Sequence, residues 1–301
     1  MTIIGFIGLG NMGGPMAANL VRHGHVVQGF DLSAASLEAA EKSGVRIAEN
    51  VMAAVAGAHC VVTMLPAGTH VLSVYGDILS AAPRGTLFID CSTIDVTSAR
   101  QAHARAEAAG MVPLDAPVSG GTGGAAAGTL TFMVGGAAQA FARAEPVLAC
   151  MGRKIVHCGD AGAGQAAKIC NNMILGISMI AVSEAFVLGE TLGLSHKALF
   201  DVASTSSGQC WSLTTYCPVP GPVPASPANN GYKPGFAVAL MLKDLRLAQE
   251  AAHASGVHTA LGARAAEIYA ALEASGEGGA DFSAVIRAIR DQSGSREHER
   301  I

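Results

Sequence analysis

A glycine-rich turn directly follows the first apolar segment of the chain, and it restricts the possible folds more than any other feature of the sequence. Residues 3–9 are apolar and rich in β-branched side chains, which predicts a buried strand. This strand leads into Gly8-Leu9-Gly10-Asn11-Met12-Gly13, and an Ala-rich helical segment follows over residues 12–23. A G-x-G-x-x-G sequence between a strand and a helix is typical of a dinucleotide-binding βαβ unit.

The three glycines of this turn have separate physical roles. Gly8 permits the tight bend, Gly10 lets a pyrophosphate approach the backbone, and Gly13 lets the helix pack closely on the strand. The N-terminus of the helix offers N–H groups and the positive end of its dipole to the phosphates. The predicted cofactor contacts are therefore Gly8, Leu9, Gly10, Asn11, Met12 and Gly13. An ordinary glycine turn is the alternative, because the chain contains 37 glycines.

An acidic residue, Asp31, ends the second predicted strand, which covers residues 26–31. A carboxylate at this position accepts hydrogen bonds from the adenosine ribose hydroxyls and repels a 2′-phosphate. Leu32 and Ser33 follow, and neither can receive such a phosphate as an arginine would. The sequence therefore favours NAD over NADP, with a loop-capping role for Asp31 as the alternative.

Apolar segments and helical segments alternate through the first half of the chain. Further strands are expected over residues 60–65, 87–90, 111–115, 131–134 and 154–157, and further helices over 34–43, 96–109 and 138–150. This alternation predicts an α/β fold with a Rossmann-like, doubly wound, mainly parallel sheet. The expected strands are apolar throughout, as strands covered on both faces are.

The pattern changes near residue 160, after which no convincing strand is found. Helices are expected over residues 165–192, 195–204, 236–255, 259–275 and 282–290, and a structured loop over 216–235. We therefore expect an NAD-binding Rossmann domain over residues 1–162, followed over 163–293 by an all-α substrate and oligomerisation domain with a long interdomain helix. Residues 294–301 are predicted to form a polar, frayed tail.

Composition argues against several classes of protein. The chain has a net charge of −4 and no cluster of Lys and Arg, so no nucleic-acid partner is expected. The longest apolar stretch, residues 173–194, contains Glu184 and Glu190 and predicts a buried helix rather than a membrane span. A second glycine-rich stretch, residues 119–136, lacks the Gly-Lys-Ser/Thr ending of a nucleoside triphosphate loop.

The seven cysteines contain no C-x-x-C pair, and several lie in apolar segments. Reduced, buried thiols in a reducing compartment are the simplest interpretation. No carboxylates and histidines stand at metal-ligand spacing, so no metal is expected. The first residues lack the basic leader of a signal peptide and the Arg-rich pattern of a transit segment, so the cytoplasm is the expected location.

Hydride transfer from an alcohol requires a group that moves the hydroxyl proton, and His and Lys are the candidates. The ten histidines show no partners in sequence and are interpreted as structural or surface residues. Lys168 lies one turn into the long helix, and Asn172 follows four positions later on the same face. Lys168 is either solvated or directed into a cleft; residue types alone favour the solvated position. Lys243 and Asp244 present the same choice, with a solvated charge pair favoured.

Five segments of the chain together resemble the β-hydroxyacid dehydrogenase family, in order and at matching spacing. They are residues 5–19, 90–95, 115–121, 164–172 and 243–245. The loop over residues 210–230 is similar to that of the branch acting on 3-hydroxyisobutyrate. The resemblance implies NAD-dependent, reversible oxidation of 3-hydroxyisobutyrate to methylmalonate semialdehyde, as in valine breakdown. Reductases of tartronate or succinic semialdehyde, an NADP enzyme and a non-catalytic NADH-binding protein are the alternatives.

The resemblance also implies roles for individual residues. Lys168 corresponds to the catalytic lysine of the family, a general acid/base, and Asn172 to its hydrogen-bonding partner in the substrate site. The loop that holds the substrate carboxylate corresponds to Ser119, Gly120 and Gly121. Contacts to the cofactor near the nicotinamide correspond to Leu65, Pro66, Thr93 and Lys243. His70 is a departure, because relatives often carry Asn at this cofactor-contacting position.

The helical half is apolar enough to leave hydrophobic surface that one subunit cannot bury. A homodimer or homotetramer is therefore expected, and the resemblance implies the same. The expected partners are a small hydroxy acid and further copies of the chain, with neither nucleic acid nor membrane.

Overall fold

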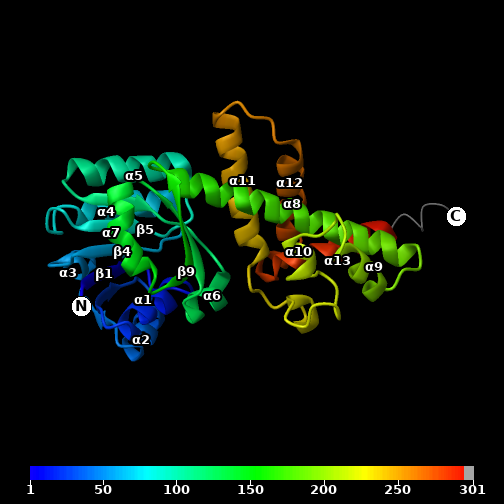
Figure 1. Ribbon diagram of the computed structural model, residues 1–301, viewed down its shortest axis with the longest axis horizontal. Coiled ribbons are helices and arrows are strands. Elements are labelled where there is room, and N and C mark those ends of the chain that lie inside the picture. The colour runs from blue at the N-terminus through cyan, green and yellow to red at the C-terminus, as the bar shows by residue number, and fades with distance from the viewer. Residues whose placement is uncertain (295–301) are drawn as a thin grey trace. The chain divides into compact units, whose positions relative to one another are not determined.

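The computed structural model describes residues 1–294 of the chain, which form two compact units (Figure 1). The first unit covers Met1–Lys168, and the second begins at Ile169. Along the chain, the division between the two units therefore falls within the helix Ala163–Thr191. The sequence pattern places the domain boundary at the start of that helix, after residue 162. The tail expected over residues 294–301 lies outside the described residues except for Gly294, which ends the last helix.

The first unit is built on one mixed, mainly parallel sheet. Its strands are β1 (Ile3–Ile7), β2 (Val26–Phe30), β3 (Arg46–Ile47), β4 (Cys60–Thr63), β5 (Leu87–Asp90), β6 (Val112–Asp115), β7 (Val118–Ser119), β8 (Leu130–Gly135) and β9 (Gly152–Gly159). The strand order is β3-β2-β1-β4-β5-β6-β8-β7, with β9 also paired to β8. Pairing is parallel from β3 to β6 and antiparallel where β8 meets β6 and β7. The predicted Rossmann-like sheet is confirmed.

Helices cover both faces of this sheet (Figure 1). They are α1 (Gly13–Arg22), α2 (Ala34–Lys42), α3 (Val51–Val55), α4 (Gly68–Ile78), α5 (Val96–Ala108), α6 (Gly121–Ala127) and α7 (Ala138–Leu148). Alternate residues of one strand enter opposite cores: Phe88 packs with α3, α4 and α5, while its neighbour Ile89 packs with α1, α2, α6 and α7. Burial on both faces explains why these strands are apolar at every position.

Five elements of the first unit were not expected from the sequence, for local physical reasons. β3 and β7 are two residues long, too short to produce a periodic pattern. α6 has the sequence GTGGAAA, in which glycines weaken the helical signal. α4 begins at Gly68 and contains β-branched residues, and α3 is only five residues long. The packing of the unit stabilises these elements despite their weak propensity.

The second unit is helical, as predicted. α8 (Ala163–Thr191) starts in the first unit and continues through the second, where it is followed by α9 (His196–Ala203), α10 (Trp211–Thr214), η1 (Pro227–Asn230), α11 (Val238–Ala254), α12 (Ala260–Ala274), η2 (Glu277–Gly279), η3 (Phe282–Ala284) and α13 (Val285–Gly294). From residue 169 to residue 294 no strand is present beyond one isolated bridge between Ala237 and Asp281. α8 is long and apolar enough to span a membrane, and half of its most apolar window is buried.

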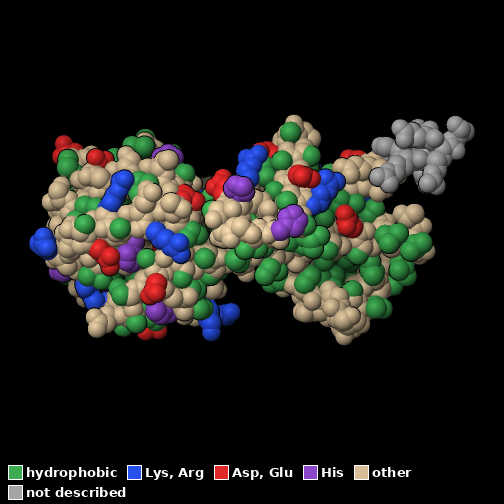
Figure 2. Space-filling model, turned by 90° about the horizontal axis from the view of Figure 1, so that it is seen from above, with side chains coloured by type: hydrophobic (Ala, Val, Ile, Leu, Met, Phe, Trp, Pro, Cys, Tyr) green, Lys and Arg blue, Asp and Glu red, His purple; other side chains and the backbone are tan. Residues whose placement is uncertain are grey.

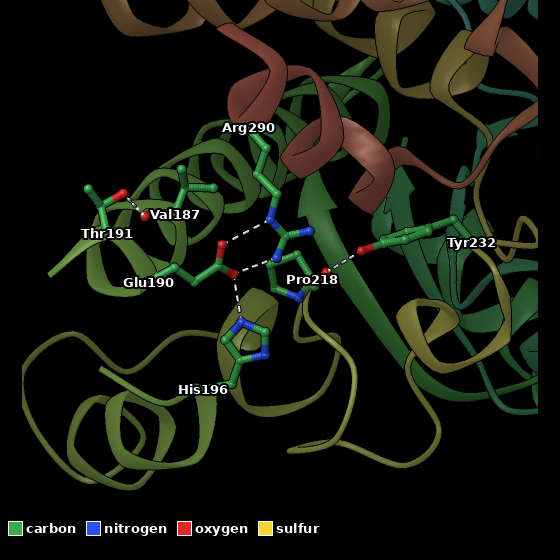
Figure 3. Close-up of polar contacts among 7 residues, drawn as sticks. All are labelled: Val187, Glu190, Thr191, His196, Pro218, Tyr232 and Arg290. Atoms are coloured by element: carbon green, nitrogen blue, oxygen red, sulfur yellow. Dashed lines mark hydrogen bonds and ion pairs between the residues drawn. The ribbon is translucent and has the colours of Figure 1, made fainter. Parts of the chain in front are cut away.

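The loop over residues 216–235 is held by side-chain hydrogen bonds within the loop, which confirms the prediction of a structured segment. Ser226 Oγ donates to the carbonyl of Cys217 at 2.6 Å, and Asn229 Nδ2 donates to that of Val223 at 2.8 Å. Tyr232 Oη donates to the carbonyl of Pro218 at 2.8 Å (Figure 3). These bonds satisfy carbonyls of a loop that has little regular secondary structure.

An ion-pair cluster joins three helices of the second unit (Figure 3). Glu190, near the end of α8, accepts hydrogen bonds from Arg290 Nε at 3.0 Å and from Arg290 Nη2 at 2.5 Å. His196 Nε2, at the start of α9, lies 2.6 Å from Glu190 Oε1. The Arg290 guanidinium on α13 holds the pKa of Glu190 below its usual value. The cluster fixes the α8–α9 turn against α13.

Candidate active site

The glycine turn between β1 and α1 has the geometry that a dinucleotide requires. Gly8 has a φ of +94°, and a Cβ on it would lie 2.3 Å from the carbonyl oxygen of Met64. A Cβ on Gly13 would lie 1.8 Å from the carbonyl oxygen of Gly8. A Cβ on Gly10, by contrast, would meet no protein atom within 4 Å. Packing of the protein therefore requires Gly8 and Gly13, while Gly10 leaves open space for a ligand beside the turn.

Asp31 lies next to this turn, directly after β2. Its Oδ2 accepts a hydrogen bond from the backbone N–H of Leu9 at 2.7 Å, and its Oδ1 accepts one from the backbone N–H of Ser33 at 2.7 Å. The carboxylate is thus fixed beside the turn and also caps its own loop, as the loop-capping alternative expects. A carboxylate has about four acceptor positions, which leaves acceptors for ribose hydroxyls. Gly10 and Asp31 together fit the pyrophosphate and the adenosine ribose of NAD.

The loops after β4 and β5 lie on the same edge of the sheet as the glycine turn, because β1, β4 and β5 are adjacent and parallel. Leu65 donates its backbone N–H to Ser92 Oγ at 2.8 Å, which joins the two loops. Pro66 is exposed and Thr93 is half-buried. His70 is exposed in the first turn of α4.

A buried carboxyl group at the end of β5, Asp90, holds these loops together. Asp90 Oδ1 accepts hydrogen bonds from Thr63 Oγ1 at 2.7 Å and from Ser92 Oγ at 2.6 Å. The backbone N–H of Ser92 also donates to the same oxygen at 3.2 Å. Burial raises the pKa of Asp90 to about 6, against the opposing effect of these hydrogen bonds. Sequence reasoning assigned Asp90 no role.

A second buried carboxylate, Asp115 at the end of β6, caps the start of α8. It accepts hydrogen bonds from the backbone N–H groups of Gly162 at 2.7 Å and Gln165 at 2.9 Å. The Gln165 amide donates to the carbonyl of Ser92 at 2.7 Å and accepts from the N–H of Ile94 at 3.1 Å. These bonds fix α8 at Gln165, three residues before Lys168, to the end of β6 and to the loop after β5.

The signal that could have identified Asp90 and Asp115 is the one that identified Asp31. Each acidic residue ends an apolar parallel strand, and strand ends of one sheet meet at one edge. The bonds from Thr63 to Asp90 and from Gly162 and Gln165 to Asp115 join residues far apart in the sequence, and no local pattern predicts them.

Lys168, the last residue of the first unit, is 6% exposed. The solvated position that residue types alone favour is therefore wrong for this lysine. The cause is tertiary: the first turn of α8 is packed and capped by the sheet, so its side chains are removed from water.

The predicted carboxylate-binding loop joins β7 to α6. Ser119 ends β7 and is half-buried, and Gly120 and Gly121 follow with φ values of +133° and +61°. Two consecutive positive φ values are strained for any residue with a side chain. The backbone of this loop is therefore one that only glycine adopts without strain.

In the second unit, Asn172 and Asp244 form a buried pair. They are 2% and 3% exposed, and Asn172 Nδ2 donates to Asp244 Oδ2 at 2.5 Å. Lys243 is half-buried, and burial lowers its pKa although Asp244 raises it. The solvated position favoured from the sequence for this pair is wrong, because Asp244 is buried and Lys243 is half-buried. Asn172 follows Lys168 by one turn of α8.

No group of three or more His, Cys, Asp or Glu side chains that could hold a metal is present among residues 1–294. A cavity of about 480 Å³ lies between α4 and α5, lined in part by Tyr75, Arg84 and Arg105. It contains none of the predicted site residues, so the candidate site is defined by the turn, loops and helix described above.

Comparison with known proteins covers nearly the whole chain. Residues 3–159 match the family described as the NAD binding domain of 6-phosphogluconate dehydrogenase, and residues 162–289 match the NAD-binding family of NADP-dependent 3-hydroxyisobutyrate dehydrogenase. A 3-hydroxyisobutyrate dehydrogenase of Pseudomonas aeruginosa is 50% identical over 296 residues, with 96% of this chain and 99% of that protein covered.

Two further relatives carry L-serine in their descriptions. An NAD-dependent L-serine dehydrogenase of Pseudomonas aeruginosa is 48% identical over 288 residues, covering 95% of this chain and 97% of that protein. A solved structure described as Mycobacterium tuberculosis 3-hydroxyisobutyrate dehydrogenase with L-serine has a TM-score of 0.94 and 57% identity, covering 96% of this chain and 99% of that one.

Proposed function

Since the chain belongs to the 3-hydroxyisobutyrate dehydrogenase family of NAD-dependent oxidoreductases, we propose that it reversibly oxidises 3-hydroxyisobutyrate to methylmalonate semialdehyde, the reaction of valine breakdown. The observation that carries the proposal is the burial of Lys168 in the capped first turn of α8. An amine kept from water at a fixed position is suited to exchange a proton with a substrate hydroxyl.

The glycine turn, from Gly8 to Gly13, binds the pyrophosphate, and Asp31 accepts hydrogen bonds from the ribose. Leu65, Pro66, His70, Thr93 and Lys243 complete the proposed cofactor contacts. NAD, when bound, supplies the nicotinamide that accepts a hydride from the substrate. The carboxylate of Asp31 opposes a 2′-phosphate, which supports a preference for NAD over NADP.

The remaining residues bind the substrate and move its proton. The backbone N–H groups of Gly120 and Gly121 and the hydroxyl of Ser119 hold the substrate carboxylate. The Nζ of Lys168 accepts the hydroxyl proton during oxidation and returns it during reduction. Asn172 donates a hydrogen bond that orients the alcohol, and Asp244 fixes the Asn172 amide.

Replacement of the lysine tests this proposal. Lys168→Ala is expected to lower kcat by about 10²- to 10⁴-fold, the usual contribution of a general acid/base. Binding of NADH, followed by nicotinamide fluorescence, should persist. Lys154→Ala is the matched control, because Lys154 is exposed on β9. Turnover of Lys168→Ala near the wild-type rate refutes the role of Lys168.

Oxidation of L-serine is a second candidate activity, supported by the descriptions of two close relatives. Serine and 3-hydroxyisobutyrate are both 3-hydroxy acids, so the same carboxylate loop and lysine would serve both. Initial rates with 3-hydroxyisobutyrate, serine, glycerate and 4-hydroxybutyrate, each with NAD and NADP, separate the candidates. The largest kcat/KM is expected for 3-hydroxyisobutyrate with NAD. A larger kcat/KM for serine would make L-serine the preferred substrate instead.

The exposed side of α8 supports a homodimer or homotetramer. Ile174, Ala181, Ala185 and Leu188 are exposed and follow each other at helical spacing, with Ile174 64% and Leu188 60% exposed. Apolar side chains gather over the helical unit in Figure 2, interrupted by few charged ones. An exposed apolar helix face of this kind is usually covered by another subunit.

Light scattering tests this assembly. The wild-type chain is expected to have at least twice the mass of one subunit, and Leu188→Glu should reduce that mass. Val257→Glu is the control, because Val257 is exposed outside α8. A wild-type mass equal to one subunit excludes the assembly.

We place the enzyme in the cytoplasm. The support is that all seven cysteines are free thiols, as is usual in a reducing compartment. Recovery of the activity in the cytosolic fraction of gently lysed cells is expected, and recovery in a periplasmic or organelle fraction contradicts this location.

A further inference from the structure

The two oxygens of Asp90 have different surroundings. Oδ1 receives three hydrogen bonds, from Thr63 and Ser92. It faces the loops after β4 and β5, which carry proposed cofactor contacts and which we call the cofactor loops. Oδ2 is fully buried and accepts no hydrogen bond from any residue within 1–294. The residue as a whole is 3% exposed. A buried carboxyl oxygen without a donor is rare in proteins and points to a partner outside the polypeptide.

His103 on α5 also has a buried polar atom without a hydrogen-bond partner among the described residues. Its side chain is 12% exposed, and Nε2 lies 3.3 Å from Oε1 of Glu107 one helical turn away. Its Nδ1 is buried and, in the described part of the chain, has no hydrogen-bond partner either. The imidazole therefore has one nitrogen toward the surface and one in the interior.

Both unsatisfied groups line the same small cavity. Asp90 and His103 border it together with Tyr75 and Asp115, and about 10 Å³ is open to the centre of a water-sized sphere. A cavity of roughly 10–15 Å³ on this measure holds one water molecule, which needs at least two polar partners. Size and polarity thus agree on a single small polar occupant.

We propose that one ordered water molecule occupies this cavity and joins Asp90 Oδ2 to His103 Nδ1, and that His103 is thereby a positioning residue for the cofactor loops. The water satisfies both buried atoms. With Oδ2 satisfied, the carboxyl plane is fixed and Oδ1 stays directed at Ser92. Ser92 in turn receives the N–H of Leu65 and the amide of Gln165.

Three variants of His103 separate the water contact from the surface contact. Asparagine places a polar atom near the position of Nδ1, glutamine places one near Nε2, and leucine places none. Asn and His have similar helix propensity, so His103→Asn disturbs α5 little. Glu107→Gln weakens only the outer contact, and it serves as a further control.

The measured quantities are the dissociation constant of NADH, by fluorescence titration, and the KM of NAD against kcat. His103→Leu and His103→Gln are expected to raise both constants by about 5-fold, the effect of one lost hydrogen bond, with kcat nearly unchanged. His103→Asn and Glu107→Gln should match the wild type. The inference rests on NAD binding alone, and the NADH titration needs no substrate, so it is independent of which hydroxy acid is oxidised.

A high-resolution crystal structure completes the test. One water peak is expected within about 3 Å of both Asp90 Oδ2 and His103 Nδ1 in the wild type, and it should be lost in His103→Leu. The proposal is overturned if the two side chains contact each other directly, or if a metal ion with short oxygen contacts fills the cavity. It is also overturned if His103→Asn binds NADH as weakly as His103→Leu.

Discussion

Three acidic side chains, Asp31, Asp90 and Asp115, each follow or end a parallel strand at one edge of the sheet, and their surroundings give them different properties. Asp31 is half-buried and accepts from two backbone N–H groups. Asp115 is buried, and burial raises its pKa although it caps α8. Asp90 is buried with one oxygen toward the cofactor loops and the other toward a small cavity. Of the three, only Asp31 is partly exposed to solvent.

Asp90 should make stability depend on pH. Its pKa rises from about 3.9 in an unfolded chain to about 6 in the fold. Between these values the folded state binds more protons, so stability falls as pH rises through the window. The difference corresponds to about 3 kcal/mol at neutral pH. Asp115, Tyr75, Cys91 and His103 face the same region, and besides burial the Asp90 charge contributes to the raised pKa values of Tyr75 and Cys91.

Asp90→Asn removes this ionisation and keeps an acceptor toward Ser92. Its free energy of unfolding relative to the wild type is therefore expected to rise between pH 4 and pH 7, by about 1–3 kcal/mol. Urea unfolding at both pH values measures the change. An identical difference between the two proteins at pH 4 and pH 7 would show that Asp90 does not titrate in this window.

At Asp31 the expected effect is on cofactor choice. Asp31→Ala removes the proposed ribose acceptors and the repulsion of a 2′-phosphate, so the Kd of NADH should rise at least about 10-fold while NADPH binding changes less or improves. Fluorescence titration with both cofactors measures this. Asp31→Asn, which keeps one acceptor, should lie between. An unchanged ratio of the two Kd values would remove Asp31 from the account of cofactor preference.

Among the elements, α8 connects the functional groups. Its first turn is capped by Asp115 and fixed by Gln165, it carries Lys168 and Asn172 one turn apart, and its last turn carries Glu190. The partner residues lie on β6, α9, α11 and α13 and in the loop after β5. The helix was predicted from its apolar length, but its capping was not, because the cap residue lies 50 positions away in the sequence.

The ion-pair cluster at the end of α8 should make a small, pH-dependent contribution to the stability of the second unit. Glu190 and Arg290 are 29% and 35% exposed, so their ion pair should contribute only about 0.5–1 kcal/mol. Because the pKa of Glu190 is lowered in the fold, this contribution is present above the unfolded pKa and is lost as pH falls through the folded one.

A double-mutant cycle of Glu190→Gln and Arg290→Ala isolates the pair from other effects of each substitution. The coupling energy from chemical unfolding is expected to be near its full value at pH 7 and to decrease as the pH falls below the unfolded pKa of Glu, about 4.3. A coupling energy of zero at pH 7 would mean that the contact in Figure 3 does not stabilise the unit.

At the scale of the whole molecule, local sequence signals were sufficient for the architecture and for the glycine turn between β1 and α1. Strands that are apolar on both faces predict the parallel sheet, and Gly8, Gly10 and Gly13 in one short motif predict the glycine turn. Burial of Lys168 and Asp244 could not be read from composition, because it depends on tertiary packing. The same holds for the bond from Thr63 to Asp90, because Thr63 ends a different strand, 27 positions away.

The two units contribute different parts of the proposed chemistry. The first contains the glycine turn, the proposed carboxylate-binding loop and Lys168; the second contains the Asn172–Asp244 pair. One proposed step joins them: the amine of Lys168 exchanges a proton with the substrate hydroxyl.

A crystal structure of the wild-type enzyme with NADH and 3-hydroxyisobutyrate, which cannot react together, tests that claim most directly. The measurement is the distance from Lys168 Nζ to the substrate hydroxyl oxygen. The account predicts hydrogen-bond distance, about 2.6–3.2 Å, with the substrate carboxylate on the loop of Ser119 to Gly121. A Lys168 amine directed into bulk water, with both ligands bound, would contradict it.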